Sequence, residues 1–250
     1  MNSKSFHLFS IQPLAFSLFC AFSALAQPML LDAPGWSLWN PANPTKSLIP
    51  AATALWLTHT DMPSNSVTYN WTNHINSAQI CTNYGTTTTN GSIGVYFAGS
   101  SGQYFQWNTN DMVPMTNSAH SIWIRFTLLA YTANSYNCLV ANRYGNGDGF
   151  YQNGSPKIIS GSAATVTGNT TLSLATKYDL FLCAGAPVAV YTNGVAASTY
   201  TSTTYAYEEF FGLGKDADSD TYANFDLADF LIATNYTFTG ADMTNMMSIP

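Results

Sequence analysis

Three alternating carboxylates within five residues, Asp216, Asp218 and Asp220, form the group in this sequence with the clearest capacity for chemistry. Carboxylate oxygens spaced in this way along a loop can converge on a hard cation, and Ca²⁺ is the natural candidate outside the cell. The stretch departs from an EF-hand loop, because Thr221 stands where that loop needs glycine and Leu227 where it needs a bidentate glutamate. A solvated acidic loop is the competing interpretation, and the sequence leaves both open.

A second candidate chemistry is sugar binding, in which an aromatic ring stacks on a sugar beside amide, hydroxyl or charged groups. Alternate residues are apolar in the stretch 121–128, so Trp123 and Arg125 fall on the opposite, less apolar face of the expected strand. Tyr131 joins that face if the strand continues so far. We therefore predict Trp123, Arg125 and Tyr131 as ligand-binding residues, with internal packing of Trp123 as the alternative.

Catalysis by paired carboxylates is poorly supported. A retaining glycosidase needs two carboxyl groups about 5 Å apart on one surface. The two glutamates, Glu208 and Glu209, are adjacent, and successive strand residues point to opposite faces. Asp179, Asp226 and Asp229 remain, but none of them is paired with another carboxylate at a spacing of two or four residues. The sequence also lacks a Gly-x-Ser-x-Gly nucleophile elbow. We therefore predict a protein without catalytic residues.

The elements that must position these residues are short strands. Runs rich in β-branched and aromatic residues alternate with clusters of Gly, Asn, Asp and Ser. Asn193-Gly194 suits a type I′ hairpin turn, because both residues tolerate positive φ. Residues 240–247 are the clearest helical stretch. This pattern predicts an all-β fold, a two-sheet antiparallel β-sandwich or jelly roll with a short C-terminal helical turn. The strand-like runs are residues 93–97, 121–128, 178–183, 188–191 and 225–232.

The N-terminus reads as a targeting segment. Lys4 precedes a short apolar run at 14–22, and small residues then end at Ala26, which is typical of a cleaved secretory signal over residues 1–26. We expect the mature protein to be secreted, extracellular or periplasmic, and no later stretch is apolar for long enough to span a bilayer. Residues 27–52 include five prolines and are expected to form an extended arm docked on a domain at 53–250.

Composition excludes some partners and leaves the cysteines undecided. Charged residues make up 8% of the chain, aromatic residues 14%, and the formal net charge is −6. Such a chain has no basic footprint for nucleic acid, and it suits a neutral partner such as a glycan. Loss of the signal leaves Cys81, Cys138 and Cys183. A Cys138–Cys183 disulfide and buried thiols are the two alternatives.

The order of these pieces resembles the laminin-G-like jelly rolls of the concanavalin A-like lectin/glucanase superfamily. Gly94-Val-Tyr-Phe-Ala-Gly99 is similar to a family strand ending in Phe-x-Gly, Ser121-Ile-Trp-Ile-Arg125 to a strand with a central Trp, and Val190-Tyr-Thr-Asn-Gly-Val195 to the family's Asn-Gly hairpin. The resemblance implies the sandwich fold, and some of these relatives bind calcium near loop ends. The matched segments are residues 53–57, 94–99, 121–125, 190–195, 211–214, 227–232 and 238–243.

Together these observations predict a secreted, non-enzymatic binding or adhesion module that recognises carbohydrate on a cell, matrix or glycoprotein surface. The first alternative is a structural surface, appendage or virion-decoration protein, for which self-association would be the main interaction. The second is a divergent glycan hydrolase. Calcium at Asp216, Asp218 and Asp220 is the cofactor expectation.

Overall fold

The computed structural model describes residues 44–61, 70–84, 89–90, 94–99, 103–107, 120–131, 137–142, 150–152, 157–160, 170–183, 188–200, 211–215 and 222–250. The predicted signal segment, residues 27–43 of the predicted arm and the acidic stretch 216–220 lie outside these ranges. Within the described residues, no helix is both long and apolar enough to cross a membrane.

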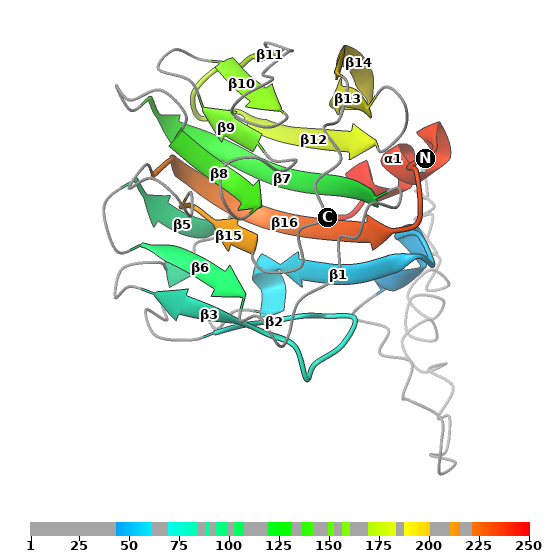
Figure 1. The fold of residues 1–250 in the computed structure, drawn as a ribbon, viewed down its shortest axis with the longest axis horizontal. Coiled ribbons are helices and arrows are strands. Elements are labelled where there is room, and N and C mark those ends of the chain that lie inside the picture. Colours follow the sequence, from blue (N-terminus) through cyan, green and yellow to red (C-terminus); the bar gives the residue numbers. More distant parts are fainter. Residues whose placement is uncertain are drawn as a thin grey trace, which may run out of the picture. The chain divides into compact units, whose positions relative to one another are not determined.

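Two sheets make up the fold, and all pairs between their named strands are antiparallel (Figure 1). Sheet A has the order β14 (Val195–Tyr200), β13 (Val188–Thr192), β12 (Lys177–Cys183), β7 (His120–Ala130), β16 (Asn224–Thr234), β5 (Val95–Ala98) and β4 (Thr89–Asn90), and β1 (Thr53–Thr58) also pairs with β16. Sheet B has the order β11 (Thr170–Thr171), β10 (Lys157–Ser160), β9 (Phe150–Gln152), β8 (Asn137–Asn142), β15 (Phe211–Leu213), β6 (Tyr104–Trp107), β3 (Ile80–Tyr84) and β2 (Trp71–Thr72). The predicted antiparallel β-sandwich is confirmed.

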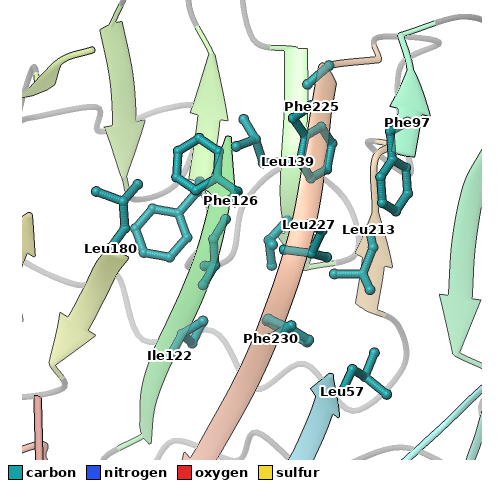
Figure 2. Packing of buried hydrophobic residues seen from close by; sticks show 14 of the residues in the cluster. Leu57, Phe97, Ile122, Phe126, Leu139, Leu180, Leu213, Phe225, Leu227 and Phe230 are labelled. Carbon is teal, nitrogen blue, oxygen red and sulfur yellow. The ribbon is translucent and has the colours of Figure 1, made fainter. Parts of the chain in front are cut away.

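The main core fills the space between the sheets (Figure 2). Strand β7 supplies Ile122, Ile124, Phe126 and Leu128, the apolar half of its alternation, as predicted. Sheet B contributes several fully buried side chains from the facing side. The burial of these large apolar side chains is the main contribution to the stability of the domain. The sheet B members of the core are Trp71, Cys81, Phe105, Leu139, Val140, Phe150 and Leu213.

A second apolar cluster covers the other face of sheet A. Trp56, Trp123, Phe181 and Leu231 project from four strands of that face and are fully buried. The C-terminal helix α1 (Gly240–Met247) packs over them together with neighbouring residues. The predicted helix is therefore confirmed, and it forms a third layer. The residues that cover the strands are Phe238, Met243, Met246 and Ile249, with Leu48 and Ile49 partly buried beside them.

The start of α1 is fixed by a capping box. Thr239 caps α1 in a capping box, in which its hydroxyl accepts from the Asp242 amide and the Asp242 carboxylate accepts from the Thr239 amide.

In the N-terminal arm, Pro44–Leu48 form the 3₁₀ helix η1, so the predicted extended conformation is wrong there. Proline is compatible with the first position of a helix, because the N–H it lacks would have no partner within the helix.

The structure confirms the predicted hairpin turn and decides between the two alternatives for the cysteines. Asn193 and Gly194 have φ values of 50° and 75° and connect β13 to β14, which confirms the predicted turn. Cys81 and Cys138 lie in sheet B and Cys183 in sheet A, and all three are buried thiols, the second of the two alternatives. Burial raises the pKa of Cys183 to about 12, with a smaller contribution from the Asp242 charge.

Candidate functional site

The residues predicted to contact a ligand occupy very different environments. Trp123 is 0% exposed and Arg125 is 1% exposed, so neither side chain is accessible to a ligand, and internal packing, the alternative given for Trp123, is what the structure shows. The physical reason is that α1 and Ile249 cover this face of β7. Tyr131, which follows β7, is 36% exposed, and its hydroxyl donates to the Leu172 carbonyl.

The predicted metal ligands Asp216, Asp218 and Asp220 lie outside the described residues, so the calcium prediction stays a prediction. Within the described ranges, no group of three or more His, Cys, Asp or Glu side chains is placed to hold a metal ion.

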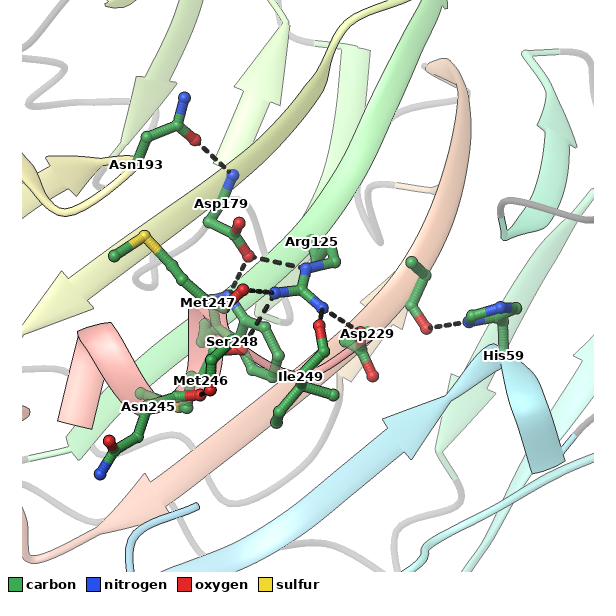
Figure 3. Close-up of polar contacts among 12 residues, drawn as sticks. His59, Arg125, Asp179, Asn193, Asp229, Asn245, Met246, Met247, Ser248 and Ile249 are labelled. Atoms are coloured by element: carbon green, nitrogen blue, oxygen red, sulfur yellow. Dashed lines mark hydrogen bonds and ion pairs between the residues drawn. The ribbon is translucent and has the colours of Figure 1, made fainter. Parts of the chain in front are cut away.

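Arg125 anchors the C-terminal segment to sheet A (Figure 3). Its Nη1 donates to the Ile249 carbonyl at 2.6 Å, and its Nη2 donates to the Met246 and Met247 carbonyls at 2.9 and 3.0 Å. The last carbonyls of a helix lack partners within the helix and collect the negative end of its dipole. A guanidinium placed there satisfies several of them at once, so Arg125 has a structural role.

Two carboxylates balance the buried guanidinium. Arg125 Nε lies 2.9 Å from Asp179 Oδ1, and Nη1 lies 3.5 Å from Asp229 Oδ2. Each carboxylate also accepts from an indole, Asp179 from Trp123 at 2.8 Å and Asp229 from Trp56 at 3.2 Å. Burial raises the pKa of Asp229, although the Arg125 charge and the Trp56 hydrogen bond oppose that shift. These groups are buried and engaged with one another.

A β-bulge places two aspartates of β16 on the same face of sheet A, although their spacing in the sequence does not predict it. The register of β16 against β7 shifts between Leu227 and Asp229, and a bulge of one residue reverses the alternation beyond it. Asp226 therefore lies opposite Thr127 and Asp229 opposite Arg125, two residues of the same face of β7. Asp226 and Asp229 are three residues apart, a spacing that would put them on opposite faces of a regular strand, and the bulge brings them to the same face. Both side chains are buried, at 7% and 1% exposure.

Asp226 gives the protein a specific pH dependence. Burial raises its pKa from 3.8 to about 6. Because the folded pKa is the higher one, protonation of Asp226 stabilises the fold below pH 4, and this contribution is lost as the pH rises through 6. Asp226→Asn should therefore raise the free energy of unfolding by about 2 kcal/mol at pH 8 and by little at pH 4. Thermal unfolding of both proteins from pH 4 to pH 8 measures this, and a difference that does not change with pH would contradict it.

The outer face of sheet B offers a different surface. Tyr84 of β3 and Tyr104 of β6 are direct register partners, and their rings stack with centroids 5.0 Å apart and planes 8° apart. Tyr84 is 37% exposed. The Lys215 ammonium lies over the Tyr104 ring, 4.8 Å from its centroid. An aromatic pair and a cation thus lie side by side on adjacent segments.

Polar side chains continue this surface along the same strands. Cys81 and Phe105 point into the core, so their neighbours Thr82 and Gln106 point outward, and these two are also register partners. Both are partly exposed. We call Tyr84, Tyr104, Thr82, Gln106 and Lys215 the tyrosine surface. It combines a stacking ring, an amide, a hydroxyl and an ammonium, the groups that bind sugars.

Strand β6 was not among the predicted strands, because Tyr104, Phe105 and Trp107 are all aromatic and give no clear alternation of apolar and polar positions. The pairing of Tyr104 with Tyr84, twenty positions earlier, was not predicted either, because register is set by the three-dimensional arrangement of strands that are not adjacent in the chain.

Several solved structures have a fold similar to that of this chain. No family model and no curated protein matches the sequence. The sialidase of Trypanosoma rangeli matches with a TM-score of 0.61 and 15% identity, over 80% of this chain and 33% of that one. A botulinum neurotoxin type C structure matches with a TM-score of 0.56 and 11% identity, over 78% of this chain and 50% of that one. The botulinum neurotoxin type G receptor-binding domain matches with a TM-score of 0.54 and 12% identity, over 76% of this chain and 49% of that one. This chain thus matches a third to a half of those chains, and the likeness shows the fold.

Proposed function

We propose that this protein is a secreted, non-enzymatic carbohydrate-binding module of laminin-G-like type and that the tyrosine surface contacts the glycan. The observation on which this depends is the stacked Tyr84–Tyr104 pair beside Thr82 and Gln106, in which Tyr84 is exposed and Tyr104 is partly exposed. An exposed aromatic ring flanked by amide and hydroxyl groups matches both surfaces of a sugar ring, the apolar C–H face and the hydroxyl edge. The buried, mutually engaged state of Asp179 and Asp229 supports the non-enzymatic part of the proposal.

The structural neighbours also favour a carbohydrate ligand. The T. rangeli sialidase is described in complex with sialic acid, and the type C neurotoxin structure is described by an interaction with two ganglioside molecules. Calcium at Asp216, Asp218 and Asp220 belongs to the same proposal, so binding is measured with Ca²⁺ and with EDTA.

Two equally exposed tyrosines allow a matched test. On a glycan array, the protein should bind a restricted set of glycans, and Tyr84→Ala should weaken that binding about tenfold, since a lost stacking contact is worth about 1.5 kcal/mol. Tyr131→Ala removes a ring of the same exposure, 36% against 37%, elsewhere on the domain and should leave binding unchanged. Loss of binding in Tyr131→Ala alone would move the site to Tyr131, and an array without any bound glycan would contradict the proposed function.

Self-association is a second candidate function, favoured by the edge of sheet A. Strand β14 ends the strand order of that sheet, and its Val195 is 70% exposed. Ala196, Ala197 and Thr199 are also exposed, so these positions have no charge that would discourage pairing with another strand. If the edge is used, light scattering should give a dimer or larger species that Val195→Lys converts to monomer. A monomer at all concentrations would remove this candidate.

A further inference from the structure

The outer face of sheet B continues along β3 beyond the tyrosine pair. Cys81 points into the core, so its neighbours Ile80 and Thr82 point outward, and Tyr84 continues the same row. Ile80 is 38% exposed and Tyr84 is 37% exposed, with the partly exposed Thr82 between them. Four residues separate the two ends, which is about 13 Å along a strand. The row is therefore longer than one sugar ring, and an exposed side chain with a large apolar surface lies at each end.

The stacked pair determines which face of Tyr84 a ligand can reach. The Tyr104 ring lies against one face of the Tyr84 ring, with the two planes 8° apart. Strand β3 has β6, which carries Tyr104, on one side and β2 on the other. The second face of the Tyr84 ring is therefore turned toward the β2 side of β3. A sugar ring that stacks on Tyr84 lies on this side of the strand.

Asn70 lies on the same side, directly before β2, and is exposed. Its Oδ1 accepts from the backbone amide of Asn83 at 3.0 Å, which places it beside the residue that precedes Tyr84. A backbone N–H can only donate, so this bond fixes which end of the Asn70 amide is the oxygen. The other end, Nδ2, has two donors that suit the oxygens of a sugar. A stacking face and a positioned amide donor thus lie close together.

A similar combination occurs at the other end of the row. Thr72 of β2 is the register partner of Ile80, and it points outward because its neighbour Trp71 is in the core. Thr72 is partly exposed, so a hydroxyl accompanies the exposed Ile80 side chain. Each end of the row therefore joins one apolar contact to one hydrogen-bonding group. Such a repeat suits a ligand that itself repeats.

We propose that the row formed by Asn70, Thr72, Ile80, Thr82 and Tyr84 binds an internal stretch of an extended, β-1,4-linked polysaccharide; this deepens, and rests on, the proposed carbohydrate-binding function. We call these five residues the β2–β3 row. Tyr84 and Asn70 contact one sugar, and Ile80 and Thr72 contact another further along the chain. A β-1,4-linked chain is extended and presents its rings along a line, whereas an α-1,4-linked chain curves away. A single terminal sugar would fill only one end of the row.

The test varies the length and the end of the ligand. The chain from residue 27 is titrated by calorimetry with cello-, xylo- and chito-oligosaccharides of two, four and six units. In at least one series the hexamer should bind at least about tenfold more tightly than the dimer, because only the longer chain reaches both ends of the row. Reduction of the hexamer's end sugar to an open-chain alditol should leave its affinity unchanged. The protein is produced in bacteria, because Asn70-Trp71-Thr72 matches the acceptor sequence for N-glycosylation.

Ile80→Ala separates a second contact from the larger number of positions that a longer chain offers. It should weaken binding of the hexamer about fivefold and leave binding of the dimer unchanged. Leu174→Ala is the matched control, since Leu174 is 40% exposed and lies before β12, away from the row. It should leave the dependence on length as in the parent protein.

Asn70→Asp tests the amide donor at the other end. It keeps an oxygen that accepts from the Asn83 amide but removes Nδ2, so it should weaken binding of dimer and hexamer alike, about fivefold. Asn193→Asp is its control, because Asn193 is also exposed and its Oδ1 accepts from the Asp179 amide at 2.9 Å, in sheet A. This control should bind normally. Equal thermal midpoints of each variant and the parent protein show that folding is intact.

The outcomes also separate the two proposals. Equal affinity for dimer and hexamer, loss of binding on reduction of the end sugar, or an undiminished dependence on length in Ile80→Ala overturns internal binding along the row. The carbohydrate-binding proposal still stands in that case if Tyr84→Ala weakens binding on the glycan array. If no oligosaccharide of the three series binds, the proposal for the row fails, and a blank glycan array removes the proposed function as well.

Discussion

Arg125→Met should lower the free energy of unfolding by about 3–5 kcal/mol, because it leaves two buried carboxylates without their counter-charge. Asp179 and Asp229 flank Arg125 on neighbouring strands, and both are nearly inaccessible to solvent. The substitution also removes the donors to the Met246, Met247 and Ile249 carbonyls. Urea denaturation measures the loss, and native-state hydrogen exchange should show α1 opening more readily than the strands of sheet A.

The matched control is Lys177→Met, which removes an exposed cation from the neighbouring strand β12. Its effect should stay within about 0.5 kcal/mol, as for most surface substitutions. The pH dependence gives a second check. Burial raises the pKa of Asp229 and the Arg125 charge opposes that shift, so without Arg125 this carboxylate should take up a proton more readily, and the stability difference between Arg125→Met and the parent protein should shrink as the pH falls. A loss below 1 kcal/mol at pH 7 would mean that packing alone holds the C-terminal segment.

The anchoring role of Arg125 explains where prediction from the sequence succeeded and where it failed. The alternation in β7 correctly assigned Ile122, Ile124 and Phe126 to the core, because a strand has a period of two whatever surrounds it. The other face of β7 appeared solvent-accessible because Ser121, Arg125 and Thr127 are polar. Its cover is a helix more than 110 residues later in the chain, and a local pattern contains no information about such contacts.

The prediction that Trp123 and Arg125 belong to a ligand-binding surface failed for the same reason. An arginine beside a tryptophan on a strand matches both a sugar site and a buried helix anchor, and only the partners distinguish them. In this molecule three of the partners are backbone carbonyls, which have no sequence signature, and the two carboxylates lie on other strands. The β16 bulge is a similar case, since one residue between Leu227 and Asp229 reverses the faces expected from alternation. Outward-facing rings such as Tyr84 become evident only once register is known.

Helix α1 covers one face of sheet A, and the tyrosine surface lies on sheet B. The position of Lys215 on that surface depends on how the chain leaves β15. Gly214 has a φ of 83°, in the left-handed region that residues with a Cβ rarely adopt. Its amide donates to the Leu139 carbonyl at 2.9 Å, and the next residue is Lys215. This glycine therefore sets the direction in which Lys215 departs toward Tyr104.

Gly214→Ala should be strongly destabilising for two independent reasons. A Cβ at this position would overlap the ring of Phe97, with Cε1 only 2.8 Å away. That ring cannot retreat easily, because it is fully buried and stacks on Phe225 with centroids 4.5 Å apart. Overpacking of a core costs about 1–3 kcal/mol, and the left-handed backbone adds about 1–2 kcal/mol. We expect a total loss of about 2–5 kcal/mol in urea denaturation.

Gly240→Ala is the control for this prediction, because nothing lies within 4 Å of a Cβ built at Gly240, at the start of α1. It should be neutral or stabilise by up to about 1 kcal/mol, since alanine is the better helix former. Equal stability of the two variants would contradict the strain argument.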